Sequence, residues 1–162
     1  MKQHIAIYPG SFDPLTNGHM DIISRGLEIF DTVVVAVASN NEKNALFSIE
    51  ERIDMINRLT AHNPRIQVES FTGLLVDYVV RKKARVILRG LRAVTDFEFE
   101  FQLAQMNRTV CPQVETLFMM TSPECAYLSS SVVKEVGRLK GDISKFVPPL
   151  VADRLMEKFG HR

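Results

Sequence analysis

Short apolar runs alternate with longer amphipathic segments along this sequence, and this alternation restricts its fold more than any other feature. Five runs are predicted to be strands, at residues 5–8, 33–38, 66–68, 86–88 and 117–120. Runs this short with few polar residues are typical of strands that are buried on both faces of a parallel sheet.

The segments between these runs carry apolar residues at helical spacing. In 19–30, residues Met20, Ile23, Leu27 and Phe30 form one apolar stripe. Further helices are expected at 48–59, 74–82, 131–139 and 148–159.

Two helix starts can be predicted from their capping residues. Ser48 and Glu51 have the spacing of a capping box, in which each side chain satisfies the other's backbone N–H. The segment 96–106 is ambiguous, because Phe97, Phe99 and Phe101 alternate as in a strand. Its continuation follows a helical period, so we predict a helix with Asp96 as its N-cap.

Alternating strands and helices predict an α/β fold: a doubly wound, five-stranded parallel sheet, Rossmann-like, with right-handed crossovers and C-terminal helices. The 162 residues suit a single domain spanning 1–162. Such sheets bind ligands beyond the carboxyl ends of their strands, where the strand order reverses. The loops that follow the strands are therefore where functional residues are expected.

Composition excludes several classes of protein. The chain has 20 basic and 19 acidic side chains, without the basic excess of most nucleic-acid binders. No apolar stretch is long enough to span a bilayer, and the N-terminus does not resemble a signal peptide. Two cysteines are too few for a disulfide framework. We therefore expect a cytoplasmic protein.

The loop after the first run suggests an anion site. Gly10 and Gly18 allow a ligand to approach the backbone closely, and Ser11 supplies a hydroxyl. His19 follows Gly18 where a helix begins, so it is expected beside free backbone amides and the positive end of the helix dipole. A surface turn with an exposed histidine is the simpler alternative.

Three later loops add further anion-binding groups. Lys43 follows the second run, Arg89 and Arg92 bracket a glycine after the fourth, and three serines at 129–131 precede a helix after the fifth. Arginine matches phosphate geometry, and a helix start with hydroxyls can cradle an anion. The sequence has no Walker motif, Cys/His metal cluster or serine-hydrolase elbow. The pattern therefore favours binding of a polyanion without a protein nucleophile.

These residues resemble a known family. Residues 8–19, Tyr-Pro-Gly-Ser-Phe-Asp-Pro-Leu-Thr-Asn-Gly-His, resemble the signature of the nucleotidyltransferase superfamily in its Thr-x-Gly-His form. The blocks 89–100 and 129–134 are similar to the bacterial phosphopantetheine adenylyltransferases. The resemblance implies adenylyl transfer from ATP to 4′-phosphopantetheine with Mg²⁺, giving dephospho-coenzyme A and pyrophosphate. It also implies a homohexamer and feedback inhibition by coenzyme A.

The resemblance also assigns site residues. From the chemistry of the implied reaction we expect catalytic roles for Ser11, His19, Lys43 and Arg92. The resemblance implies acceptor binding by Ser11, Lys43, Leu75 and Arg89. It implies ATP binding by Ser11, Phe12, His19, Gly90, Leu91, Arg92, Glu100, Cys125, Ala126, Tyr127, Leu128, Ser129, Ser130 and Ser131. No protein ligand to a metal is expected.

In the expected mechanism the acceptor's own phosphate is the nucleophile, so catalysis consists of positioning and charge stabilisation. Alternatives are another adenylyl- or cytidylyltransferase of the superfamily, a non-catalytic nucleotide sensor, or an interaction module. The sequence leaves open whether Phe97, Phe99 and Phe101 lie in the core, in the pocket or at a subunit contact.

Overall fold

A five-stranded parallel sheet forms the centre of the computed structural model, which describes residues 4–39, 44–92 and 94–161. Its strands are β1 (Ile5–Gly10), β2 (Thr32–Ala38), β3 (Ile66–Phe71), β4 (Val86–Leu91) and β5 (Glu115–Met120). They lie in the order β3-β2-β1-β4-β5, and every neighbouring pair is parallel. This arrangement confirms the predicted α/β, Rossmann-like class.

Within the described ranges, six helices connect and extend the sheet. They are α1 (Asn17–Ile29), α2 (Ile49–Thr60), α3 (Leu75–Arg81), α4 (Val94–Val110), α5 (Ser130–Arg138) and α6 (Pro149–Phe159), with a short 3₁₀ turn at Pro123–Cys125. The capping box of Ser48 and Glu51 is present as predicted. The segment 96–106 is helical, but the helix begins at Val94, so the prediction that Asp96 is its N-cap was wrong. Asp96 lies in the first turn and pairs with Arg92 instead.

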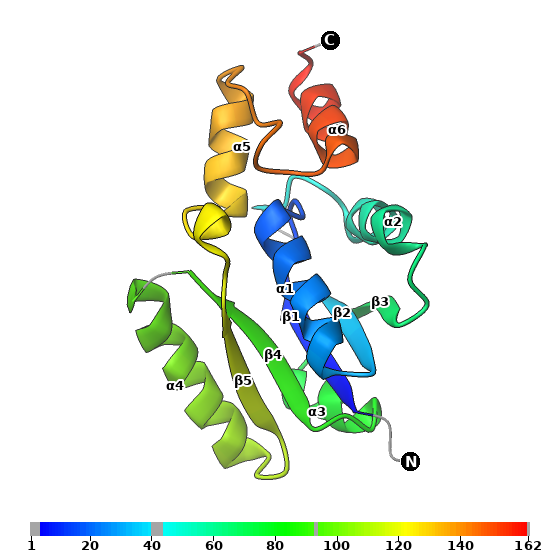
Figure 1. The fold of residues 1–162 in the computed structure, drawn as a ribbon, viewed down its shortest axis with the longest axis vertical. Helices are drawn as coiled ribbons and strands as arrows, with labels where there is room; N and C mark the ends of the chain where they lie inside the picture. Colours follow the sequence, from blue (N-terminus) through cyan, green and yellow to red (C-terminus); the bar gives the residue numbers. More distant parts are fainter. Residues whose placement is uncertain (1–3, 40–43, 93, 162) are drawn as a thin grey trace.

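The helices cover the sheet on two faces (Figure 1). On one face, α1 and α2 pack with α6 around a core that includes Ile22, Ile56 and Leu155. On the other face, α3 packs around a second core that includes Ile87 and Val79. Helices α5 and α6 lie beyond the upper end of β1 in Figure 1. This end is the carboxyl edge of the sheet.

Burial on both faces holds for the central strands but not for the edges. β2 is buried along almost its whole length. β5 alternates between exposed and covered positions, and Met120 is 60% exposed, so the expectation of full burial for 117–120 was wrong. β5 is an edge strand with a single strand neighbour, β4, so less of its surface is covered than in the central strands.

The order of the strands reverses at β1. The chain moves outward from β1 to β2 and β3, then returns to place β4 on the other side of β1. The connections on either side of this point diverge, which leaves a crevice at the carboxyl ends of β1 and β4. Helix α1 starts at this crevice and runs back along the sheet.

Gly26 sets the close approach of α1 to the sheet. A Cβ atom at this position would lie 2.9 Å from Leu88 Cδ2 and 3.3 Å from Val33 Cγ2. Leu88 and Val33 are fully buried, so neither can move aside at little cost.

We expect Gly26→Ala to lower the free energy of unfolding by about 1–3 kcal/mol, because overpacking outweighs the roughly 1 kcal/mol gain in helix propensity. Urea unfolding measures this difference. Ser24→Ala, at an exposed position of the same helix, is the control and should lose no stability. If Gly26→Ala were as stable as wild type or more stable, α1 and the sheet would be able to move apart far enough for the added methyl group at little cost.

Candidate active site

A cavity of about 430 Å³ opens at the carboxyl ends of β1 and β4, where the topology predicts a ligand. β1, β4 and the loops after them supply part of the wall, and the segment between β5 and α5, together with α1, α4 and the start of α5, supplies the rest. Twelve predicted residues line it: Ser11, Phe12, His19, Arg89, Gly90, Arg92, Glu100, Cys125, Leu128, Ser129, Ser130 and Ser131. The sheet therefore brings most of the predicted residues into one place.

His19 is held by the start of its own helix. Thr16 caps α1, and the backbone N–H of Thr16 donates to His19 Nδ1 at 2.9 Å. A ring nitrogen that accepts a hydrogen bond from an amide carries no proton, so the neutral imidazole has its proton on Nε2. Burial, together with the positive charges of Arg92 and Arg89, lowers the pKa of His19 to about 4. His19 is thus a neutral donor at physiological pH.

The start of α1 offers fewer free amides than the sequence suggested. The backbone N–H of Asn17 donates to Phe146 O at 2.9 Å, and that of His19 reaches Thr16 Oγ1 at 3.4 Å. The expectation that His19 lies beside several free amides was therefore wrong. The anion-binding capacity here depends mainly on the imidazole itself.

Both predicted arginines are paired with carboxylates. Arg89 donates to both oxygens of Glu100 and, at 2.8 Å, to the carbonyl of Pro9. Arg92 donates to Asp96 at 2.9 Å and to the carbonyl of Leu128 at 3.0 Å. These contacts fix the guanidinium groups in the wall of the cavity and balance their charge.

The position of Arg89 differs from the prediction. β4 continues to Leu91, so Arg89 lies within the strand rather than in the loop after it. Arg92, in contrast, follows the strand and contacts Leu128 in the segment before α5.

The three serines before α5 have separate structural roles. Ser129 is the N-cap and accepts from the N–H of Val132, and Ser130 Oγ donates to Pro14 O at 2.7 Å. Within the described ranges no acceptor contacts the amides of Ser130 and Ser131. Both residues line the cavity, so their amides are available to an anion there, and the anion cradle at this helix start stays a prediction.

A second cavity of about 280 Å³ adjoins the first. It shares Ser11, Arg89 and Glu100 with the first cavity, and it also contains the predicted residue Leu75. Its other lining includes the apolar residues Ala38, Ile87, Leu103 and Ala104, the amide of Asn107 and the hydroxyl of Thr116. A polar cavity and a more apolar one thus meet at Arg89.

Four predicted residues are not placed in these walls. Leu91 is buried, whereas Ala126 and Tyr127 lie outside both linings, and Tyr127 packs edge-on against Phe146. Lys43 lies outside the described residues.

Several lining residues were missed by the sequence reasoning. Asp96 stands four positions after Arg92, a spacing that can indicate a helical ion pair. Leu103, Ala104 and Asn107 lie on one face of α4, but nothing local indicates that this face borders a ligand. Tyr8 and Thr121 could have been included because they lie near the carboxyl ends of strands.

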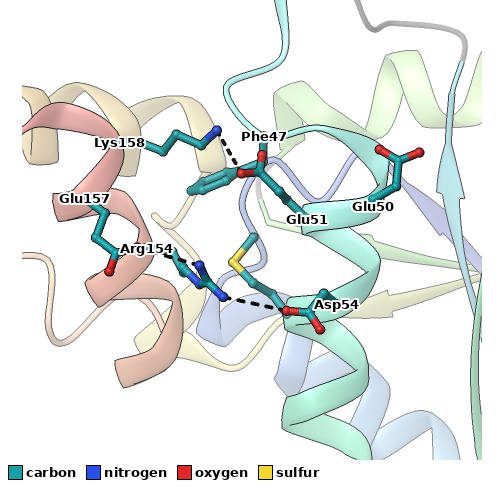
Figure 2. A pocket seen from close by; sticks show the side chains of 8 residues that line it. Phe47, Glu50, Glu51, Asp54, Arg154, Glu157 and Lys158 are labelled. Atoms are coloured by element: carbon teal, nitrogen blue, oxygen red, sulfur yellow. Dashed lines mark ion pairs between the residues drawn. The ribbon is translucent and has the colours of Figure 1, made fainter.

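A larger groove of about 480 Å³ lies elsewhere, between α2 and α6 (Figure 2). Phe47 and Met55 form its apolar floor. Lys158 pairs with Glu51 at 2.9 Å and Arg154 with Asp54 at 3.8 Å across it. Its charged groups are thus mostly satisfied by one another, and it lies apart from the crevice between β1 and β4.

Two further properties concern the described residues as a whole. They contain no group of three or more His, Cys, Asp or Glu side chains placed to hold a metal ion. Among the described helices, none combines the length and apolar character needed to cross a bilayer.

Comparison with solved structures agrees with the observed fold. The chain superimposes with a TM-score of 0.71 on a candidate nicotinate-nucleotide adenylyltransferase from Vibrio parahaemolyticus, covering 98% of this chain and 95% of the other. The two sequences are 16% identical, so this likeness concerns the fold alone.

Sequence comparisons are more specific. The cytidylyltransferase-like family model matches residues 7–136. Proteins named phosphopantetheine adenylyltransferase are 62% identical in Geobacter metallireducens, over 98% of both chains, and 61% identical in Geobacter sulfurreducens, over 98% of this chain and 97% of the relative. One from Caldanaerobacter subterraneus is 54% identical over 96% of this chain and 97% of its own. The chain therefore belongs to the phosphopantetheine adenylyltransferase family.

Proposed function

We propose that this chain, as a single nucleotidyltransferase domain, transfers the adenylyl group of ATP to 4′-phosphopantetheine in coenzyme A biosynthesis. The products are dephospho-coenzyme A and pyrophosphate. The observation that carries this proposal is the 62% identity, over 98% of both chains, to a protein named phosphopantetheine adenylyltransferase. The cavity at the point where the strand order reverses supports it.

The two adjoining cavities suit the two substrates. The larger one presents His19, Arg92 and the amides of Ser130 and Ser131, which are donors for a triphosphate. The smaller one presents Leu75 and Leu103 beside Asn107, which suits a flexible arm containing amide bonds. Ser11 and Arg89 lie in both linings, so the acceptor phosphate would meet the nucleotide there.

The reaction requires little covalent chemistry from the protein. An oxygen of the acceptor phosphate forms a bond to the α-phosphorus of ATP, and the bond from that phosphorus to the bridging oxygen of pyrophosphate breaks. His19 Nε2–H donates to an α-phosphoryl oxygen as charge accumulates there, while Arg92 offsets charge and Ser11 orients the acceptor phosphate. Lys43 is proposed to assist through its charge.

The remaining nucleotide contacts are proposed from family resemblance and position. Phe12, Gly90, Leu91, Glu100 and the segment 125–131 would surround the ATP molecule. Mg²⁺ would enter with the nucleotide, because phosphate oxygens and water are the ligands that this ion prefers. The ion would neutralise phosphate charge, and Asp96 and Glu100, the carboxylates in the cavity wall, would remain paired with arginines.

Self-association is also part of the proposal. Phe99 and Met106 on α4 are 62% and 64% exposed, and Leu117 on the neighbouring edge strand is 42% exposed. Large apolar side chains that are exposed to this extent favour a contact with another copy of the chain. We propose that the chain forms a homohexamer in the cytoplasm. We also propose that coenzyme A inhibits it, because the pantetheine arm of coenzyme A matches that of the acceptor.

The acceptor can be tested by substitution of substrates. We expect product formation with 4′-phosphopantetheine and none with nicotinate mononucleotide or glycerol 3-phosphate, with ATP preferred over CTP. Mass spectrometry of the products identifies the group transferred. Preference for another acceptor would retain the nucleotidyltransferase reaction but reject the proposed substrate. ATP binding without transfer to any acceptor would favour a nucleotide sensor.

Removing the imidazole should affect turnover more than binding. We expect His19→Ala to lower kcat by about 10²–10³-fold, the usual loss for one transition-state donor. The KM values for both substrates should change by only a few-fold. Steady-state kinetics at saturating concentrations separates the two effects. Large losses of affinity with unchanged kcat would contradict the role of His19.

Neutral His19 also makes stability depend on pH. Between pH 6.5 and 4 the unfolded chain binds a proton at this residue, whereas the folded chain does not. Stability is therefore lost as the pH falls, by roughly 2–3 kcal/mol for a shift of this size at a partly exposed ring. Urea unfolding of wild type and His19→Gln across this window measures the difference. Equal pH dependence in the two proteins would contradict a depressed pKa.

Arg89 should matter more for the acceptor than for ATP. Its removal alone would uncover the carboxylate of Glu100, so the comparison is made in a Glu100→Gln background. We expect Arg89→Met in that background to raise KM for 4′-phosphopantetheine at least tenfold more than KM for ATP. A selective loss of ATP affinity would reverse the assignment.

A further inference from the structure

The buried carboxylate of Asp13 joins three parts of the chain behind the candidate active site. Its Oδ1 accepts from the N–H of Phe47 at 2.9 Å, and its Oδ2 accepts from the N–H of Leu46 at 2.9 Å. Lys134 Nζ donates to the same Oδ2 at 2.8 Å. The Asp13 side chain is only 6% exposed and that of Lys134 21%, so the pair is largely shielded from water.

Neither member of this pair lines the cavity, but each is covalently close to residues that do. Asp13 directly follows Ser11 and Phe12, which form one wall. Lys134 lies on α5 about one turn after Ser130 and Ser131, which form the facing wall. The ion pair therefore connects the two walls from behind.

The connection is reinforced beside the cavity. Ser130 Oγ donates to Pro14 O at 2.7 Å, so α5 is attached to residues 13 and 14 at two successive turns. The amides of Leu46 and Phe47 hold the same carboxylate from the segment before α2. Burial alone would raise the pKa of Asp13, but the Lys134 ammonium and these two amides outweigh it and keep the pKa below its usual value. The carboxylate therefore stays charged at physiological pH.

We propose that Asp13 and Lys134 are positioning residues that set the separation between the wall carrying Ser11 and His19 and the anion cradle at the start of α5. This inference rests on the proposed function, because it takes that separation to be the one a triphosphate requires. A displacement near 1 Å between such groups can reduce a rate by about 10²-fold.

Lys134→Met tests this role, since methionine keeps the length of the side chain without its charge. Lys158→Met is the matched control, because Lys158 and Glu51 form an ion pair of 2.9 Å between α6 and α2 (Figure 2). Neither residue lines the cavity. Unfolding free energies are measured first, and kinetics are run where each protein is fully folded. Under this condition a loss of activity reports a displacement of the cavity walls and not a fraction of unfolded protein.

We expect kcat/KM for ATP to fall about 10–100-fold in Lys134→Met and to stay within twofold of wild type in Lys158→Met. Lys134→Arg, which keeps the charge, should recover most of the lost activity. Asp13→Asn should show a loss similar to that of Lys134→Met, and the double variant should be no worse than either single one, as for residues that act as a unit. If Lys134→Met does not fold, Lys134→Gln replaces it, with at least a fivefold loss expected.

Calorimetric titration with magnesium ATP provides a second measure that does not depend on the acceptor. We expect about tenfold weaker binding by Lys134→Met than by wild type or Lys158→Met. Wild type that binds ATP but transfers nothing to 4′-phosphopantetheine would reject the proposed acceptor and leave this comparison valid. Folded Lys134→Met with wild-type kcat/KM and wild-type ATP affinity would overturn the positioning role. Equal losses in Lys134→Met and Lys158→Met would overturn it as well.

Discussion

The hydrogen bond from the backbone N–H of Thr16 to His19 Nδ1 is the contact on which the site's chemistry depends. It closes a capping box in which histidine takes the place usually held by Glu or Gln. One interaction thus starts α1, selects the tautomer of the imidazole and places its remaining N–H in the cavity wall. Phe12 lies edge-on against the ring at a centroid distance of 5.0 Å, which further restricts its orientation.

Among the described residues, the arginines of the site are paired with carboxylates rather than left as free cations. Arg89 is balanced by Glu100 and Arg92 by Asp96, and behind the cavity the partly exposed Lys134 is balanced by Asp13. Donors that are fixed in this way need little reorganisation when charge shifts on a bound phosphate, which is how preorganised sites stabilise transition states. The same pairs connect β4 to α4 and α5 to the loop after β1. The ion pairs that set the charge of the cavity therefore also hold the elements that shape it.

The fold and the location of the site could be predicted from the sequence, but much of the site's internal geometry could not. Strand–helix alternation indicated the sheet, and the loops after the strands indicated Ser11, His19 and the serines before α5. Contacts between distant residues, such as Asn17 with Phe146 and Asp13 with Lys134, have no local signal because they depend on how α5 and the following turn pack. Strand ends were also underestimated, since Arg89 and Gly90 belong to β4 despite their polar or small character.

The tautomer and charge of His19 can be observed directly by nitrogen NMR of protein labelled at its four histidines, with His19→Gln used to assign the signal. The account predicts a neutral ring protonated at Nε2 that begins to titrate only as the pH approaches about 4. A ring that titrates near pH 6.5, or one protonated at Nδ1 when neutral, would contradict the capping geometry and the donor role assigned to this residue.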